Sequence, residues 1–175
     1  MLKILETLII VLLLTASGSD VSADQLEDGI AAYQRGDFAT ALRLFRPLAE
    51  QGDASAQTNL GVMYEQGRGV AQNYREAMRW FRLAAMQGDA SAQSNLGVMY
   101  FKGQGIAQDF REAMRWYRLG AGQGNAEAQF LGVMYEQGRG VPQDLLRAHM
   151  WFNLAASQSS DENGKLKRLP ADLNR

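Results

Sequence analysis

The chain contains few residues of the types and spacing that catalysis or metal binding needs. Its 175 residues include one histidine, His149, and no cysteine. The missing cysteine excludes disulfides, thiolate metal sites, a cysteine nucleophile and a lipid-bearing N-terminal cysteine. A lone histidine and scattered carboxylates disfavour both a histidine metal cluster and a Ser-His-Asp triad. His149 lies beside a predicted buried stripe, so we expect a structural role for it, and we expect neither metal nor cofactor.

The glycine-rich stretches do not form a phosphate-binding loop. Residues 67–69, Gly-Arg-Gly, lack the Lys-Ser/Thr pair and the preceding strand that such a loop needs. Three other glycines recur at one position inside predicted helices, where each costs about 1 kcal/mol relative to alanine. We therefore predict that Gly61, Gly97 and Gly132 lie where two helices cross and only a hydrogen atom fits.

Arginines are the main charged feature. They recur at i, i+4 and i+7 in two predicted helices, which places each set on one exposed face. The six are Arg75, Arg79, Arg82, Arg111, Arg115 and Arg118. Such a row suits an anionic cell-envelope polymer or a lipid surface. The favoured interpretation is a solvated convex face with local ion pairs, Glu76 to Arg79 and Glu112 to Arg115. In the last unit these positions hold Leu146, Met150 and Asn153.

An internal repeat supplies the elements that position these residues. The stretch 60–70 returns at 96–106 and again at 131–141. The steps between equivalent glycines are 36 and 35 residues. A fixed period of this length predicts a solenoid in which each unit contacts mainly its neighbours. Such arrays provide a binding surface more often than a reaction centre.

Apolar spacing predicts two helices in each unit and no sheet. In the repeat at residues 53–88, apolar residues 56, 60, 63 and 64 follow one 3.6-residue stripe, and residues 77, 80, 81 and 84 follow another. Short polar acceptors suited to N-caps precede the helices: Asp37, Asp53, Asn73, Asp89, Asp109, Asn125 and Asp144. Glycines suited to left-handed C-caps follow them: Gly52, Gly67, Gly88, Gly103, Gly124 and Gly138. Aromatic residues that share the stripes with alanines are assigned to the core: Tyr64, Tyr100, Tyr135, Trp80, Trp116 and Trp151.

The repeated pattern resembles a known family. It reads Ala-Gln-x-x-Leu-Gly-Val-Met-Tyr-x-x-Gly-x-Gly-Val, then Ala-x-x-Trp-Phe-x-x-Ala-Ala-x-x-Gly, and is similar to the Sel-one-like repeat over about residues 53–156. The shorter unit before it resembles a tetratricopeptide repeat. The resemblance implies an all-α fold, a right-handed α-solenoid of about four antiparallel helix pairs, with the first helix of each pair on the concave side. It also implies protein binding as the commonest role.

The same resemblance raises an enzymatic alternative. Some proteins of this family have been associated with β-lactam binding or hydrolysis. This chain has no Ser-x-x-Lys and no Lys-Thr-Gly, so the serine-enzyme machinery is missing. We therefore expect no enzymatic activity, with a cell-wall or β-lactam hydrolase as the less favoured alternative.

The ends of the chain need separate treatment. Residues 1–23 fit a secretory signal peptide, with Lys3, an apolar run at 8–14 that is too short to span a bilayer, and a Val-Ser-Ala cleavage site before Asp24. A retained membrane anchor is the alternative. Export predicts a periplasmic or secreted protein without a membrane span after cleavage. The mature chain would carry 17 basic and 17 acidic residues, which gives no reason to expect nucleic-acid binding.

The repeat domain spans residues 24–156, with units at 24–52, 53–88, 89–124 and 125–156. The tail, 157–175, is at most a weak cap, because only Leu166, Leu169 and Leu173 could cover the last helix pair. Terminal repeats need a polar outer face. We expect a short helix near 161–169, or completion of the end by a partner or by end-to-end self-association.

One residue is missing between Gly124 and Gly132. A deletion inside a helix turns everything on one side by about 100°. Counting back from Gly132 puts Glu127 where Ala92 is buried, whereas counting forward from Gly124 puts Phe130 level with Ser94. We predict a late start or a local distortion between residues 125 and 130.

Positions that differ between units are the candidate binding site. If the family geometry holds, the concave face presents Ser55, Thr58, Glu65, Ser91, Ser94, Phe101, Glu127, Phe130 and Glu136. Phe101 replaces a glutamate and Phe130 replaces a threonine or serine. Exposed aromatic rings in a groove are candidate anchors for a peptide, although a single surface ring needs no functional explanation. The sequence thus predicts an exported helical-repeat scaffold for a protein or peptide partner.

Overall fold

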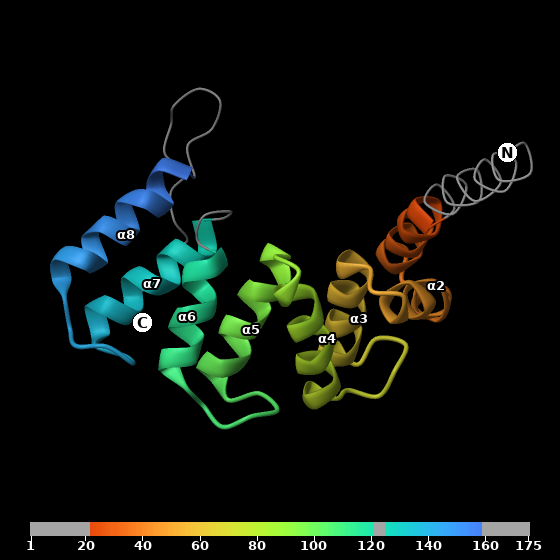
Figure 1. Cartoon of the computed structure of the whole chain (residues 1–175), viewed down its shortest axis with the longest axis horizontal. Helices are drawn as coiled ribbons and strands as arrows, with labels where there is room; N and C mark the ends of the chain where they lie inside the picture. Colours follow the sequence, from red (N-terminus) through yellow and green to blue (C-terminus); the bar gives the residue numbers. More distant parts are fainter. Residues whose placement is uncertain (1–21, 121–124, 159–175) are drawn as a thin grey trace, which may run out of the picture. The chain divides into compact units, whose positions relative to one another are not determined.

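The computed structural model describes residues 22–120 and 125–158, which form helices joined by turns and loops, with no strand among them. Residues 22–34 are helical and precede the labelled helices of Figure 1. Those helices are α2 (Phe38–Glu50), α3 (Ala54–Gln66), α4 (Tyr74–Met86), α5 (Ala90–Lys102), α6 (Phe110–Gly120), α7 (Asn125–Gln137) and α8 (Leu145–Gln158). The all-α repeat fold predicted from the sequence is confirmed.

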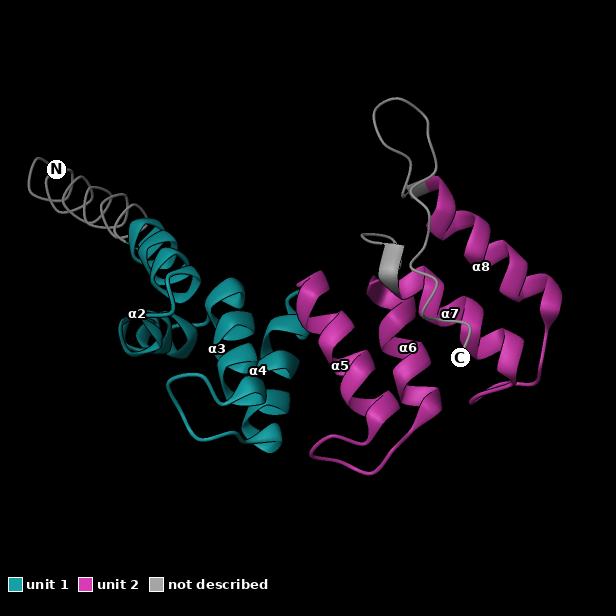
Figure 2. Ribbon diagram, turned by 180° about the vertical axis from the view of Figure 1, so that it is seen from behind, with its two compact units in different colours: residues 1–87 teal, residues 88–175 magenta. Residues whose placement is uncertain are grey.

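The chain divides into two compact units, residues 1–87 and residues 88–175 (Figure 2). In the first unit α3 packs against α2 and α4, and in the second α5 packs on α6, α6 on α7 and α7 on α8. Most of the predicted leader, 1–23, and of the predicted tail, 157–175, lies outside the described part of the chain, at residues 1–21 and 159–175. Within that part, none of the helices has the length and apolar character needed to cross a membrane.

Polar caps set the helix starts. The carboxylate of Asp53 accepts a hydrogen bond from the Ala56 amide at 2.7 Å, and Asp89 does the same for Ala92 at 2.7 Å. These bonds satisfy amides that the first helical turn leaves without a partner. The same role is filled at the other described starts by Asp37, Asn73, Asp109 and Asp144. Asn125 is the exception, because it is the first residue of α7 rather than a residue before it.

Each first helix crosses its partner at a glycine. A Cβ built on Gly61 would lie 2.6 Å from the Phe81 ring, and one on Gly97 would lie 2.5 Å from the Tyr117 ring. The same contact joins Gly29 to Phe45 and Gly132 to Phe152. Real Cβ atoms essentially never approach a ring so closely. The predicted reason for the recurring glycines is confirmed, and it also applies to the first repeat.

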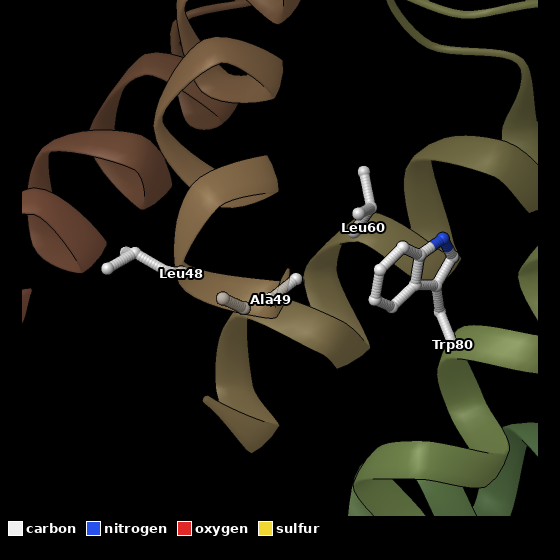
Figure 3. Close-up of a cluster of buried hydrophobic side chains, with 5 residues drawn as sticks. Leu48, Ala49, Leu60 and Trp80 are labelled. Carbon is white, nitrogen blue, oxygen red and sulfur yellow. The ribbon is translucent and has the colours of Figure 1, made fainter. Parts of the chain in front are cut away.

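The first unit has a core of small and large apolar residues from neighbouring helices. Leu48, Ala49, Ala56, Leu60 and Trp80 form one buried cluster (Figure 3). Trp80 is 6% exposed, which confirms its assignment to the core. In this cluster the large Leu48 of α2 is paired with the small Ala56 of α3.

In the second unit, side chains on α8 are less buried than those at equivalent positions of α6. Trp116 is buried at 9% exposure, but Trp151, at the equivalent position of α8, is only half-buried. Met114 is 2% exposed, whereas His149 at the equivalent position is exposed. The assignments of Trp151 to the full core and of His149 to a structural position were therefore wrong. In an array, these positions are covered by the next unit, and α8 has no described unit after it.

The register of α7 corrects the predicted distortion. The helix is continuous from Asn125, and Gly132 lies seven positions after its first residue, as Gly97 lies seven positions after Ala90 in α5. The missing residue therefore falls ahead of the helix. Glu127 takes the position of Ala92, and Phe130 takes that of Asn95 rather than Ser94.

Candidate functional site

In the first unit, the predicted concave positions lie on α3. Ser55 is exposed and Glu65 is half-buried. Thr58 is only 9% exposed, so it offers little surface to a partner, and its place in the predicted site was wrong. The backbone carbonyls of Ser55 and Glu65 accept bonds from Asn59 and Gln72. Partner binding at these positions stays a prediction.

In the second unit, the predicted positions lie on α5 and α7. Ser91 and Glu136 are exposed, and Ser94 is half-buried. Glu127 is 8% exposed and belongs to the helix packing, so its assignment to the binding face was wrong. The physical reason is the register of α7, which turns this position toward α6.

The structure brings the two predicted anchors together. The ring centroids of Phe101 and Phe130 lie 6.5 Å apart at an interplanar angle of 48°. Phe101 also meets Phe110 edge-on at 5.3 Å, and Phe130 stacks on Tyr117 at 4.9 Å. Because the two anchors remain half-buried, part of each ring is accessible while the rest is held by other rings. We call Phe101, Phe110 and Phe130 the aromatic surface.

An arginine from the loop after α7 caps this aromatic surface. The Arg139 guanidinium lies 5.5 Å from the Phe101 centroid and 5.8 Å from that of Phe110. The following Gly140 lies so close to Phe110 that an added Cβ would be 2.8 Å from its carbonyl carbon. Cation–π attraction of this kind is worth about 0.5–2 kcal/mol. The Arg-Gly pair therefore fastens one repeat to the one before it.

The first unit uses the same device. Arg68 lies 5.3 Å from the centroids of both Tyr33 and Phe38 and donates a 3.0 Å bond to the tyrosine hydroxyl. Gly69 approaches the Phe38 backbone as Gly140 approaches Phe110. From the sequence, the first glycine of this Gly-Arg-Gly stretch was predicted as a C-cap and a phosphate loop was rejected, but the contact made by the arginine was missed. Its recurrence at 67–69 and 138–140 was the available signal.

A recurring glutamine also went unnoticed. The side-chain amides of Gln72, Gln108 and Gln143 donate to the backbone carbonyls of Glu65, Phe101 and Glu136 at 2.7–2.9 Å. Each bond ties the loop after a first helix back to the last turn of that helix. Phe101 is also a residue of the aromatic surface, so the hydrogen bond from Gln108 holds the backbone of Phe101 in place.

A buried carboxylate lies beside the aromatic surface. A Cβ on Gly120 would come within 3.1 Å of the Glu127 side chain, so the missing side chain at 120 makes room for the carboxylate. In the first unit the equivalent positions hold the opposite combination, the large Leu48 and the small Ala56. Burial, and secondarily the nearby Glu127, raises the pKa of the Tyr117 hydroxyl well above its usual range.

The arginine row forms the predicted local ion pairs. Arg79 bonds Glu76 at 3.3 Å, and Arg115 bonds Glu112 at 3.3 Å. The two guanidiniums also lie over Trp80 and Trp116, at 4.7 and 5.3 Å. Solvent-exposed pairs of this kind contribute little to stability, typically about 0.2–1 kcal/mol. The interpretation as a solvated face with local pairs is confirmed, while binding of an anionic polymer or lipid stays a prediction.

No catalytic constellation emerges among residues 22–120 and 125–158. Within them, no group of three or more histidine or carboxylate side chains is placed to hold a metal ion. His149 is exposed on α8. The features that the described chain does assemble are aromatic and cationic surfaces, which suit binding.

Comparison with known proteins agrees with the geometry. The family model described as Sel1 repeat matches residues 26–53, 54–89, 90–125 and 128–160. The match therefore includes the first repeat, predicted at residues 24–52. No significant match was found among curated proteins.

Two crystal structures are similar to the chain. A Sel1 repeat protein from Oxalobacter formigenes is 33% identical, with a TM-score of 0.72, over 77% of this chain and 54% of that one. A protective antigen present in uropathogenic Escherichia coli strains, with an SLR fold, is 39% identical, with a TM-score of 0.75, over 82% of this chain and 32% of that one. The chain thus spans about half and about a third of these longer proteins.

Proposed function

Because this chain belongs to the Sel1 repeat family, we propose that it is a scaffold that binds a protein or peptide partner through the aromatic surface of its second unit. The observation that carries the proposal is the pairing of Phe101 with Phe130 on neighbouring first helices. Proteins built from this repeat are generally helical scaffolds rather than enzymes.

The chemistry of the aromatic surface supports a peptide as the guest. Aromatic rings supply large contact areas at low entropic cost, and binding hot spots are enriched in such groups. Phe101 and Phe130 each replace a polar residue of the preceding repeat, Glu65 and Asn95 respectively. Exposed polar side chains at Ser91 and Glu136 lie on the same two helices and suit a polar rim.

The proposal includes export. It rests on the leader-like residues 1–23 of the sequence. Its test is the mass of the protein purified from cells that make the whole chain. A mature N-terminus at Asp24 supports cleavage and export, whereas a protein that still begins at Met1 contradicts cleavage.

The binding proposal is tested by affinity purification from envelope fractions with wild type and Phe101→Ala. We expect a partner to co-purify with wild type and to be reduced about tenfold or more with the variant, because a hot-spot ring contributes at least about 2 kcal/mol. Lys102→Ala is the matched control, since Lys102 is exposed on the same helix and belongs neither to the aromatic surface nor to its rim. Equal recovery with Phe101→Ala would rule out the aromatic surface as the docking site.

A further inference from the structure

The second unit contains an arginine-lined hollow outside the aromatic surface. It has a volume of about 520 Å³ and lies along α6 and the loop after α7. Arg111, Arg115 and Arg118 line it together with the apolar Met114, Leu119 and Val141. Leu119 is 50% exposed, although it is a large apolar side chain. The hollow therefore combines cationic groups with apolar surface that water contacts.

A second hollow of about 340 Å³ shares Arg118 with the first. Its other lining residues are Tyr135, Arg147, Met150 and Trp151. The Arg118 guanidinium donates to the Tyr135 hydroxyl at 2.5 Å and to the Met114 sulfur at 3.4 Å, so its position is fixed. Arg118 separates two apolar spaces, and we name the pair of hollows the arginine groove.

Positive charge exceeds negative charge along this groove. The guanidiniums of Arg118 and Arg147 both lie over the Tyr135 ring, 6.0 and 5.7 Å from its centroid. Arg147 pairs with Asp144, and Arg115 pairs with Glu112, both at 3.3 Å and both largely exposed. With Arg111, four guanidiniums thus face two carboxylates. Guanidinium is the side chain best suited to hold a carboxylate through two parallel hydrogen bonds.

We propose that the arginine groove docks an acidic peptide segment that carries aliphatic side chains, so that carboxylates meet the arginines and the aliphatic groups enter the two hollows. Charge complementarity selects an acidic guest. The apolar lining on both sides of Arg118 selects a peptide with alternating acidic and apolar groups over a sugar polymer, which lacks aliphatic side chains. This second docking surface shares no lining residue with the aromatic surface, so each proposal can fail without the other.

The test uses the full chain and a fluorescently labelled synthetic helix with glutamate and leucine on one face. Fluorescence anisotropy is measured with wild type and with the double variant Arg111→Gln/Arg115→Gln. We expect the variant to bind about tenfold or more weakly, and wild-type binding to weaken as salt is added. The matched control removes two exposed charges elsewhere, Arg35→Gln/Lys102→Gln, and is expected to bind like wild type.

Two further comparisons make the result specific. Helices with lysine for glutamate, or with serine for leucine, are expected to lose binding, because the groove requires both charge and apolar groups. Arg118→Gln, checked by its thermal melt, is expected to lose binding as well. Equal binding by the wild type and Arg111→Gln/Arg115→Gln overturns the proposal. So does binding to anionic-lipid vesicles or an anionic glycan without binding to the acidic helix.

Discussion

At the scale of residues, the second unit carries two polar substitutions at buried positions, Tyr117 and Glu127. Tyr117 stands where the other second helices have Phe45, Phe81 and Phe152, and its hydroxyl is buried without a hydrogen-bond partner in the described chain. Glu127 replaces a buried alanine nearby. A buried polar group without a partner costs about 1–3 kcal/mol. Tyr117 therefore carries a polar cost that the equivalent phenylalanines lack.

Tyr117→Phe tests this cost. We expect the variant to be more stable at neutral pH, by about 1 kcal/mol, because it removes the buried hydroxyl and keeps the ring. The raised pKa of Tyr117 adds a pH dependence. The unfolded chain releases the tyrosine proton near pH 10 and the folded chain releases it later, so wild-type stability falls as pH rises above about 10. Urea melts at pH 7 and above pH 10 should show a smaller alkaline loss for the variant. An equal loss in both proteins would contradict the assignment.

Gly97→Ala tests the helix crossing. Alanine favours helix by about 1 kcal/mol, but its Cβ would lie 2.5 Å from the Tyr117 ring, and overpacking of this kind typically costs about 1–3 kcal/mol. We expect a net loss of stability in a thermal melt. Ser91→Ala, an exposed change on the same helix, is the control and should change the melting temperature little. A Gly97→Ala protein that melts above wild type would disprove the steric explanation.

At the scale of elements, sequence periodicity was sufficient to predict the helices but not all of the contacts between them. The caps and the crossing glycines could be predicted because each depends on one helix pair and recurs at one step. The clamps of Arg68 and Arg139 could not, because the cation and the rings it covers are more than 25 residues apart and belong to different repeats. Glu127 was misplaced because its register depends on where the deletion before α7 falls.

The second helices provide a test of how burial varies along the array. Trp116→Ala removes a ring that is 9% exposed and should cost about 3–5 kcal/mol. Trp151→Ala removes a half-buried ring from α8 and should cost less. Thermal melts of the two variants measure the difference. Equal melting temperatures would show that α8 is covered as fully as α6.

At the scale of the whole molecule, α8 presents the largest apolar exposure of the described chain apart from Met86. Leu145, Leu146 and Met150 are 64%, 74% and 63% exposed. This agrees with the prediction that the last helix pair needs cover, and end-to-end association stays a prediction of the sequence. The family and the all-α fold followed from the repeat alone, whereas the arginine groove emerged only when α6, α7 and α8 were placed together.

The proposed partner site is the aromatic surface of the second unit. Its most direct test replaces Phe101 with a photo-crosslinking phenylalanine analogue in living cells, with Glu50 on α2 as the control position because it is exposed outside this surface. We predict that illumination traps one discrete protein from position 101 and not from position 50. No adduct at 101, or the same adducts from both positions, would contradict the account.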